Sequence, residues 1–249
     1  MDYRLSYIEC ALHAGWVGTP KNEVIRSETW AQLTTPGSSR VLQNGVFRSV
    51  LDEGEVASKI EQVIEGYRAL GVPFWWVVTP LTRPCDMAAR LTERGFQLTS
   101  RAMGMCKDPR GVVLRCPEGV TVEEVSAHNI EEWARVQAEG WGPDFVEDPL
   151  VPPPPEQRID VLVRSQGQVA GAGSILFLDG FTHLLRGVTL PAFRGRGVFR
   201  ACVERRLEIA AERGAPVATS HCLAETSAPI YRRLGFEEVC ELAYYRYGP

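Results

Sequence analysis

The sequence predicts an α+β (mixed α/β) protein of two domains with similar folds, each a mostly antiparallel central sheet flanked by helices. Three observations predict this class. The 249 residues, of which 45% are hydrophobic and 23% charged, suit a folded chain with one or two cores. Segments with strand and helix periodicity alternate along the chain. Two short motifs also recur, in the same order, in the two halves.

The N-terminal half begins with predicted strands at Val24–Thr35 and Val41–Val50, which are rich in β-branched residues. The apolar spacing of Glu55–Leu70 predicts a helix that ends at Gly71. The apolar run Phe74–Val78 is then expected to be a buried strand.

Turn-forming residues cluster in Lys107–Gly111 and Pro117–Gly119, between two periodic regions. We expect the domain boundary there, with a first domain at residues 1–117 and a second at residues 118–249.

The second domain is expected to open with a strand at Val120–Val125 and a helix that Asn129 starts through a capping box with Glu132. Ile130, Trp133 and Ala134 share one face of that helix. Further predicted elements follow in order: strands at 159–163, 168–178 and 181–190, with hairpin turns at 166–167 and 179–180; a helix at 198–213; a strand at 217–220; a helix ending at 234–236; and two strands at 238–242 and 243–247.

The two halves share an internal repeat. Gly71-Val-Pro73 matches Gly214-Ala-Pro216, and Arg90–Phe96 matches Ile230–Phe236, at nearly the same offset. Each match follows a helical pattern, which favours two copies of one αβαβ unit.

Composition limits the partners. The net charge of −4 and the absence of a long Lys/Arg run argue against nucleic-acid or membrane-surface binding, so we expect a small-molecule partner. The apolar run Gly71–Val78 is too short to span a bilayer, and the first residues lack a signal-peptide pattern, which predicts a cytoplasmic protein. The seven cysteines are scattered without metal-ligand spacing, so we expect reduced, buried thiols and no metal.

The sharpest motif is Arg194-Gly195-Arg196-Gly197-Val198-Phe199, a glycine-rich turn that leads into a helix. Backbone N–H groups and the helix dipole at such a turn favour an anion, here best a pyrophosphate, and the arginines add positive charge. A solvated basic turn is the alternative. A dinucleotide fingerprint is excluded because Arg200 stands where its third glycine would be, and no acidic residue ends the strand at 217–220.

On these residues the C-terminal half resembles the GNAT superfamily of acyl-CoA-dependent N-acyltransferases. Residues Val120–Tyr247 follow its order of strands and helices, and Arg194–Phe199 resembles its pyrophosphate loop, with Phe199 in place of the usual small residue. Ser227–Phe236 resembles its helix ending in Y-x-x-x-G-F. With the internal repeat, this indicates a tandem form whose N-terminal copy is degenerate.

The resemblance implies acetyl-CoA as cosubstrate and a splayed strand pair in the second domain. The pyrophosphate would lie on Arg194, Gly195, Arg196, Gly197, Val198 and Phe199, and the pantetheine would pair with Val188, Thr189 and Leu190. An amine would attack the acyl carbon directly, and Tyr231 stands in the family's position for the acid that protonates the leaving thiolate.

His183 is the candidate base, because it lies on the strand before the loop and an ordinary histidine pKa of about 6.5 suits the task. A structural histidine is the alternative reading; His221 is a weaker candidate, and Cys222 beside it is expected to be inert. Trp141, Asp144 and Glu147 follow the first helix of the second domain, where the family lines its acceptor site. Their charge suits a cationic amine, although a solvated acidic loop is equally expected.

The predicted activity is transfer of acetyl to a primary amine of a small molecule, by a monomer or homodimer. The N-terminal copy lacks the glycine loop and has Leu91 at the position that matches Tyr231, so we expect it to bind no coenzyme A. The alternatives are a non-catalytic acyl-CoA-binding module and a protein or peptide N-acetyltransferase.

Overall fold

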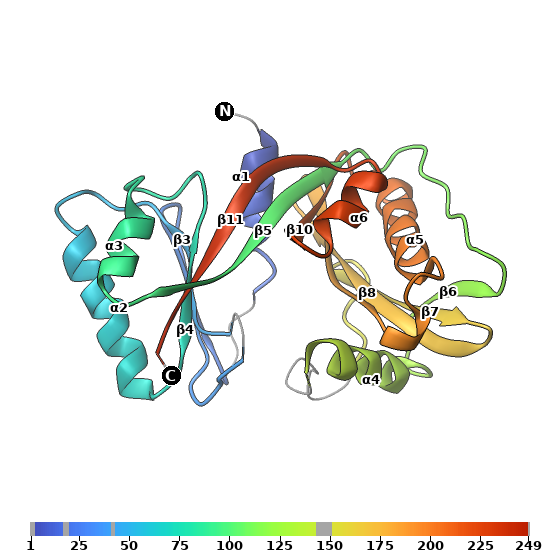
Figure 1. The fold of residues 1–249 in the computed structure, drawn as a ribbon, viewed down its shortest axis with the longest axis horizontal. Coiled ribbons are helices and arrows are strands. Elements are labelled where there is room, and N and C mark those ends of the chain that lie inside the picture. The colour runs from blue at the N-terminus through green and yellow to red at the C-terminus, as the bar shows by residue number, and fades with distance from the viewer. Residues whose placement is uncertain (1–2, 17–19, 41–42, 143–150, 249) are drawn as a thin grey trace. The chain divides into compact units, whose positions relative to one another are not determined.

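The computed structural model describes residues 3–16, 20–40, 43–142 and 151–248. The chain forms two compact units (Figure 1). The first comprises Met1–Met105, Cys222–Arg232 and Glu238–Pro249, and the second Cys106–His221 and Arg233–Glu237. The units therefore differ from a simple division after residue 117, because the C-terminal strand is part of the first unit.

The first unit is a sheet with the strand order β1-β2-β3-β4-β11-β5, flanked by helices. β11 runs antiparallel to β4, from Ala243 beside Val78 to Tyr247 beside Phe74. Its elements are α1 (Tyr3–Cys10), β1 (Glu23–Arg26), β2 (Trp30–Thr34), β3 (Gly45–Ser49), α2 (Val56–Leu70), β4 (Phe74–Val78), α3 (Met87–Glu93), β5 (Gln97–Lys107) and β11 (Glu237–Tyr247).

Helix α2 covers one face of this sheet with residues at helical spacing, among them Ile60, Ile64 and Tyr67. It ends where Gly71 adopts a left-handed conformation with φ of 66°, as the sequence predicts. The adjacent Trp75 and Trp76 point to opposite faces of β4, so each belongs to a different core cluster.

Two strand predictions are wrong. The segment 24–35 is two strands, because the hydroxyl of Ser27 accepts hydrogen bonds from the N–H groups of Thr29 and Trp30 and turns the chain. The two strands expected at 238–242 and 243–247 are the single strand β11. The junction of Leu242 and Ala243 contains no turn-forming residue, so the strand continues through it.

The second unit has the strand order β10-β9-β8-β7-β6. β7 and β8 lie between α4 on one side and α5 on the other (Figure 1). The predicted hairpin turns are present, with φ of 51° at Gln166, 75° at Gly167 and 79° at Gly180. Its elements are β6 (Val120–Glu124), α4 (Ile130–Trp141), β7 (Arg158–Ser165), β8 (Gln168–Leu178), β9 (Phe181–Thr189), a 3-10 turn (Pro191–Phe193), α5 (Val198–Glu212) and β10 (Ala218–Leu223); the short α6 (Ala228–Arg233) follows.

Helix α4 buries Ile130, Trp133 and Ala134, as its pattern predicts, but it has no capping box. The side chain of Asn129 makes no capping hydrogen bond; its Oδ1 accepts the N–H of Ser126 at 2.7 Å instead. The preceding turn therefore takes the oxygen that the box would have needed.

Each unit contains a parallel strand pair joined by a helix of 15 residues. In the first unit α2 joins β3 to β4, and in the second α5 joins β9 to β10. Six further pairs, β1–β2, β2–β3, β4–β11, β6–β7, β7–β8 and β8–β9, are antiparallel, so both sheets are mostly antiparallel, as predicted. This shared unit is what the internal repeat in the sequence predicts.

The thiols differ in exposure. Cys106, Cys202, Cys222 and Cys240 are buried, but Cys85 and Cys116 are exposed, so the expectation of uniformly buried thiols is wrong. No helix among the described residues is long and apolar enough to cross a membrane. Within the same part of the chain, no cluster of three or more His, Cys, Asp or Glu side chains is arranged to hold a metal ion.

Candidate active site

Residues Arg194–Gly197 precede α5 and are called the glycine–arginine loop. Gly195 and Gly197 have φ of 75° and 78°, a left-handed conformation that favours glycine. No side chain of the described residues caps α5, and the N–H of Ala201 makes the first bond within the helix, to the Gly197 carbonyl at 3.0 Å. The amides of the first turn therefore point out of the helix end, where they favour an anion.

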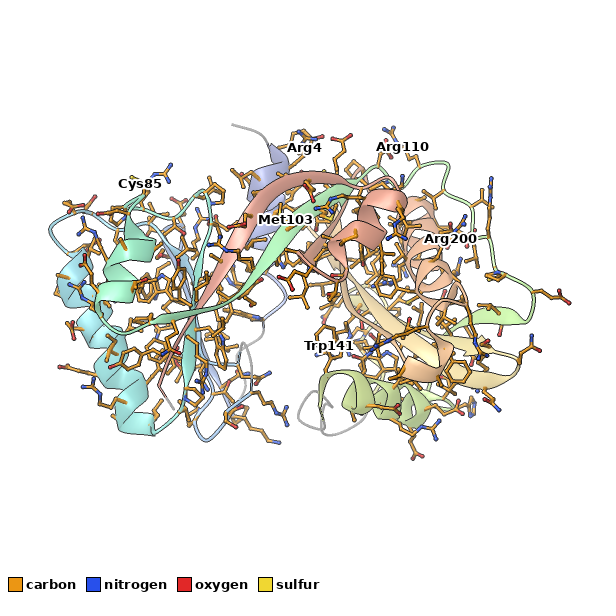
Figure 2. All side chains as sticks on the ribbon, in the orientation of Figure 1. Arg4, Cys85, Met103, Arg110, Trp141 and Arg200 are labelled. Atoms are coloured by element: carbon orange, nitrogen blue, oxygen red, sulfur yellow. The ribbon has the colours of Figure 1, made fainter. Side chains whose placement is uncertain are left out.

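Arginines surround this helix end. Arg194 and Arg196 are exposed, and the guanidinium of Arg196 lies 5.6 Å from the ring centre of Phe193. Arg200, on the first turn of α5 (Figure 2), donates from Nε to the Glu204 carboxylate at 2.7 Å. Three cations thus lie near the anion-binding turn, and Glu204 fixes the orientation of one of them.

The segment that precedes β6 packs along α5. The N–H of Arg115 donates to the Glu204 carboxylate at 2.9 Å, so Glu204 contacts both this segment and Arg200. Pro117 lies against Gly197, and a Cβ on this glycine would come within 2.5 Å of the Pro117 Cγ. Gly197 is therefore required by its contact with Pro117 as well as by its φ.

The bulky residue in the loop is accommodated by a glycine on β9. A Cβ on Gly187 would lie 3.0 Å from the Phe199 ring, which therefore occupies the space that a side chain at 187 would need. Phe199 and Gly187 form a complementary pair, which explains how the structure accommodates a phenylalanine at 199.

Just before the 3-10 turn, the end of β9 has a backbone edge that faces away from β8. The N–H of Leu190 donates to the Ala170 carbonyl at 2.9 Å, so this pair is hydrogen-bonded in the antiparallel ladder. The neighbouring pair, Thr189 with Gly171, then directs its backbone polar groups away from β8. Of Val188, Thr189 and Leu190, it is Thr189 whose N–H and carbonyl point toward the side where an extended ligand can pair.

β9 and β10 form a short parallel pair. Their register runs over three positions, from Thr182 beside Ala218 to Leu184 beside Ser220. β9 then enters a bulge in which Gly173 of β8 faces both Arg186 and Gly187. The carbonyls of residues 185 and 186 are bonded by side chains of α5 and α4, which fits the predicted splayed strand pair.

His183 lies on the sheet face opposite α5, and only 5% of its surface is exposed. The Thr219 hydroxyl donates its single proton to the Thr182 carbonyl at 3.1 Å, so His183 Nδ1–H must be the donor in the 2.9 Å bond to Thr219. Nε2 then carries the lone pair. Burial, followed by the nearby His221 and Arg206, lowers the pKa of His183 well below its usual value, so the ring is neutral at pH 7.

Tyr231 lies on α6 with 3% of its surface exposed, and its N–H donates to the Ser227 carbonyl. It belongs to the first compact unit, whereas the glycine–arginine loop and His183 belong to the second. Its role as the acid stays a prediction.

Of the predicted acceptor residues, Trp141 ends α4 and is 42% exposed (Figure 2). Asp144 and Glu147 lie outside the described residues. A buried polar group that no sequence motif indicates lies on the same sheet face as His183. Asp160 of β7 accepts bonds from Ser174 Oγ at 2.5 Å and from Arg158 at 3.1 Å, and burial raises its pKa.

With the fold and the loop described, comparison with known proteins shows which family the second unit resembles. Residues 126–236 match the model of the acetyltransferase (GNAT) family. This segment of the chain is therefore similar to a GNAT acetyltransferase domain. No curated protein sequence matches the chain.

Solved structures share the fold over nearly the whole chain. A GCN5-related N-acetyltransferase from Kribbella flavida has a TM-score of 0.78 at 20% identity, over 99% of this chain and 96% of that one. A tandem GNAT protein from the clavulanic acid biosynthesis pathway has a TM-score of 0.63 at 12% identity, over 98% and 88%. A GCN5-related N-acetyltransferase from Sphaerobacter thermophilus has a TM-score of 0.64 at 14% identity, over 91% and 75%.

Proposed function

We propose that this protein transfers an acetyl group from acetyl-CoA to a primary amine of a small molecule, using a single cosubstrate site in its second unit. The observation that carries the proposal is the uncapped N-terminus of α5, with two left-handed glycines and three arginines, beside the open edge of β9. Amides and guanidinium groups suit the pyrophosphate, and the β9 edge suits the two amides of pantetheine.

The site residues fit this cosubstrate at both places. The loop glycines leave the first-turn amides of α5 accessible, and Thr189 directs its N–H and carbonyl away from β8, so an extended chain can add to the sheet as a strand would. Acetyl-CoA supplies the activated thioester. The acceptor nitrogen forms a bond to the acetyl carbon while the carbon–sulfur bond breaks, so the amine must lose one proton and the leaving sulfur must gain one.

The base we propose is His183. Its Nδ1–H is held by Thr219, which leaves the lone pair on Nε2 available to accept the proton of the amine. Its lowered pKa keeps the ring unprotonated at neutral pH, at the expense of basicity. Tyr231 is proposed as the acid for the leaving sulfur, on the family resemblance, and Trp141, Asp144 and Glu147 are proposed to line the acceptor site.

The proposed N-terminal copy keeps the parallel strand pair and the 15-residue helix but has no glycine-rich turn before α2. Glu55, whose carboxylate would repel a phosphate, stands at the start of this helix. We therefore propose one acetyl-CoA site in the chain.

The first test is calorimetric titration of acetyl-CoA into the wild type, Arg194→Glu and Arg196→Glu. Charge reversal beside the loop should weaken binding by at least tenfold, because each variant replaces an attractive charge by a repulsive one. Arg110→Glu is the matched control, since Arg110 is exposed and forms an ion pair with its near neighbour Asp108. A stoichiometry of one is expected, and a wild type that binds no acetyl-CoA would refute the proposal.

The second test is release of coenzyme A with a panel of small primary amines, compared with basic peptides. Release with the small amines supports the proposed reaction. Binding without release from any amine would favour a non-catalytic acyl-CoA-binding module, and release with peptides alone would favour a peptide acetyltransferase. Tyr231→Phe should lower turnover and leave the affinity for acetyl-CoA unchanged; wild-type turnover in this variant would exclude Tyr231 as the acid.

A further inference from the structure

The bulge in β9 contains a conformation that needs support. Arg186 has φ of 55°, in the left-handed region that residues other than glycine rarely adopt. Such conformations are unfavourable for a residue with a side chain and persist only where surrounding groups hold them. Two fully buried side chains, one from each face of the sheet, donate hydrogen bonds to the carbonyls of Leu185 and Arg186.

The first of these side chains is Arg206 of α5, which is 0% exposed. Its Nη1 donates to the carbonyls of Leu185 and Ser174, both at 3.1 Å, and its Nε donates to the Cys202 carbonyl at 3.0 Å. Leu185 and Ser174 are the last paired residues before the bulge. The guanidinium therefore joins the two strands just where their regular ladder stops.

The second side chain is Gln137 of α4, which is also 0% exposed. Its Nε2 donates to the Arg186 carbonyl at 3.1 Å, from the face opposite α5. The guanidinium of Arg186 lies 5.8 Å from the ring centre of Trp133, one helical turn before Gln137. α4 thus holds both the backbone and the side chain of the left-handed residue.

The strands are shaped around Arg206. A Cβ on Gly173 would lie 2.9 Å from the Arg206 Cζ, and a Cβ on Gly187 would lie 3.4 Å from its Nη2. Burying a guanidinium is unfavourable compared with a well-packed apolar side chain, so stability alone gives no reason for Arg206 at this position. The two glycines and the buried cation indicate that the shape of the bulge is what this arrangement maintains.

We propose that Gln137 and Arg206 are positioning residues for acyl transfer, which together hold the β9 bulge so that the backbone edge at Gly187 and Thr189 receives the acyl end of acetyl-CoA. This inference rests on the proposed function. The glycine–arginine loop lies beyond Leu190, so a pantetheine chain that runs back along β9 from the loop passes Thr189 and reaches the bulge with its thioester. The bulge then sets the position of the acyl carbonyl, while the loop sets that of the pyrophosphate.

The test separates these two contributions by titrating acetyl-CoA and coenzyme A into Gln137→Met, Arg206→Met and Arg206→Lys. Gln137→Met is nearly isosteric and removes one hydrogen bond, so it is the variant expected to fold without change. Arg205→Met is the matched control: it removes a cation from the adjacent position of α5, where Arg205 pairs with surface carboxylates.

We expect the affinity of Gln137→Met and Arg206→Met for acetyl-CoA to fall about tenfold and that for coenzyme A to change less than twofold, because the loop is intact. Arg206→Lys keeps a donor and should recover part of the loss. Amide hydrogen exchange of the free proteins should accelerate in peptides covering residues 185–190, and the Arg205→Met control should match the wild type in both measurements.

The outcomes are distinguishable. A wild type that binds neither ligand refutes the proposed function and the role of the two residues with it. The positioning role alone is refuted if the wild type binds both ligands but Gln137→Met behaves like the control. In that case its ratio of acetyl-CoA to coenzyme A affinity and its amide exchange at 185–190 would both equal those of Arg205→Met. Equal losses for both ligands would also refute it, because they would indicate a structural defect that reaches the loop.

Discussion

The contact between Phe199 and Gly187 gives a quantitative test of how the loop accommodates its bulky residue. In Gly187→Ala the new Cβ would lie 3.0 Å from the Phe199 ring and 3.4 Å from Arg206 Nη2, which is tighter than ordinary van der Waals contact. Overpacking of this kind costs about 1–3 kcal/mol. Gly187 does not have a left-handed φ, so backbone strain adds nothing to the effect.

Phe199→Ala removes a partly buried ring and should cost about 1–2 kcal/mol by itself, less than a fully buried phenylalanine. The double variant removes the ring that the new methyl group meets. Its destabilisation should therefore be smaller than the sum of the two single effects by about 1 kcal/mol.

Equilibrium urea unfolding of the wild type, the two single variants and the double variant measures this coupling. Calorimetric titration of acetyl-CoA into the same four proteins shows whether the contact also shapes the site, and the double variant should bind more tightly than Gly187→Ala. Additive free energies of unfolding within about 0.3 kcal/mol would refute the complementary pairing of the two residues.

Three further predictions concern the rest of the chain. Burial, with Arg26 and Arg48 nearby, lowers the pKa of His13 from 6.5 to about 4, so between these values the unfolded chain takes up a proton that the folded chain does not. The free energy of unfolding should therefore fall by up to about 3 kcal/mol as the pH drops through this window. Urea unfolding at a series of pH values should show a weaker pH dependence for His13→Leu than for the wild type, and an equal pH dependence would contradict this. A thiol reagent should modify Cys85 and Cys116 rapidly and the four buried thiols only after unfolding. Of the two exposed thiols, Cys116 should react more slowly, because partial burial and the carboxylates of Glu204 and Glu208 raise its pKa. Gly195 and Gly197 share a left-handed φ, but only in Gly197→Ala does the new Cβ come within 2.5 Å of Pro117. Gly197→Ala should therefore have a lower melting temperature than Gly195→Ala, and equal melting temperatures would argue against that contact.

The sequence predicts elements well where one local signal dominates. The strand at 74–78 and the helix that ends at Gly71 follow directly from an apolar run and from a left-handed C-cap. The capping box of Asn129 failed because Ser126 competes for the same side-chain oxygen, a choice between two local bonds that spacing cannot decide. The continuous strand β11 was predictable locally, because no turn-forming residue separates Leu242 from Ala243; its pairing with β4, far away in the sequence, was not.

The residues of the candidate site likewise fall into some that the sequence predicts and some that it does not. The loop at 194–199 is visible in the sequence because its glycines and arginines are contiguous. Gln137 and Arg206 were missed because each looks like an ordinary polar residue of an amphipathic helix. A signal was nevertheless present: Arg206 shares a helical face with Cys202 and Ala210, so the pattern places a charge where the core should be. His183 was selected as a base, and only the structure adds that Thr219 fixes its tautomer.

The return of β11 to the first unit has a consequence for the order of folding during synthesis. β11 pairs with β4 through residues 243–247, at the very end of the described chain, and supplies Leu242, Tyr244 and Tyr245 to the core clusters on the two faces of that sheet. Until these residues leave the ribosome, β4 keeps an unpaired edge, although its own unit begins at the N-terminus. During synthesis the N-terminal domain usually folds first, but here the first unit cannot be completed until β11 has been made, after the segment Cys106–His221 of the second unit.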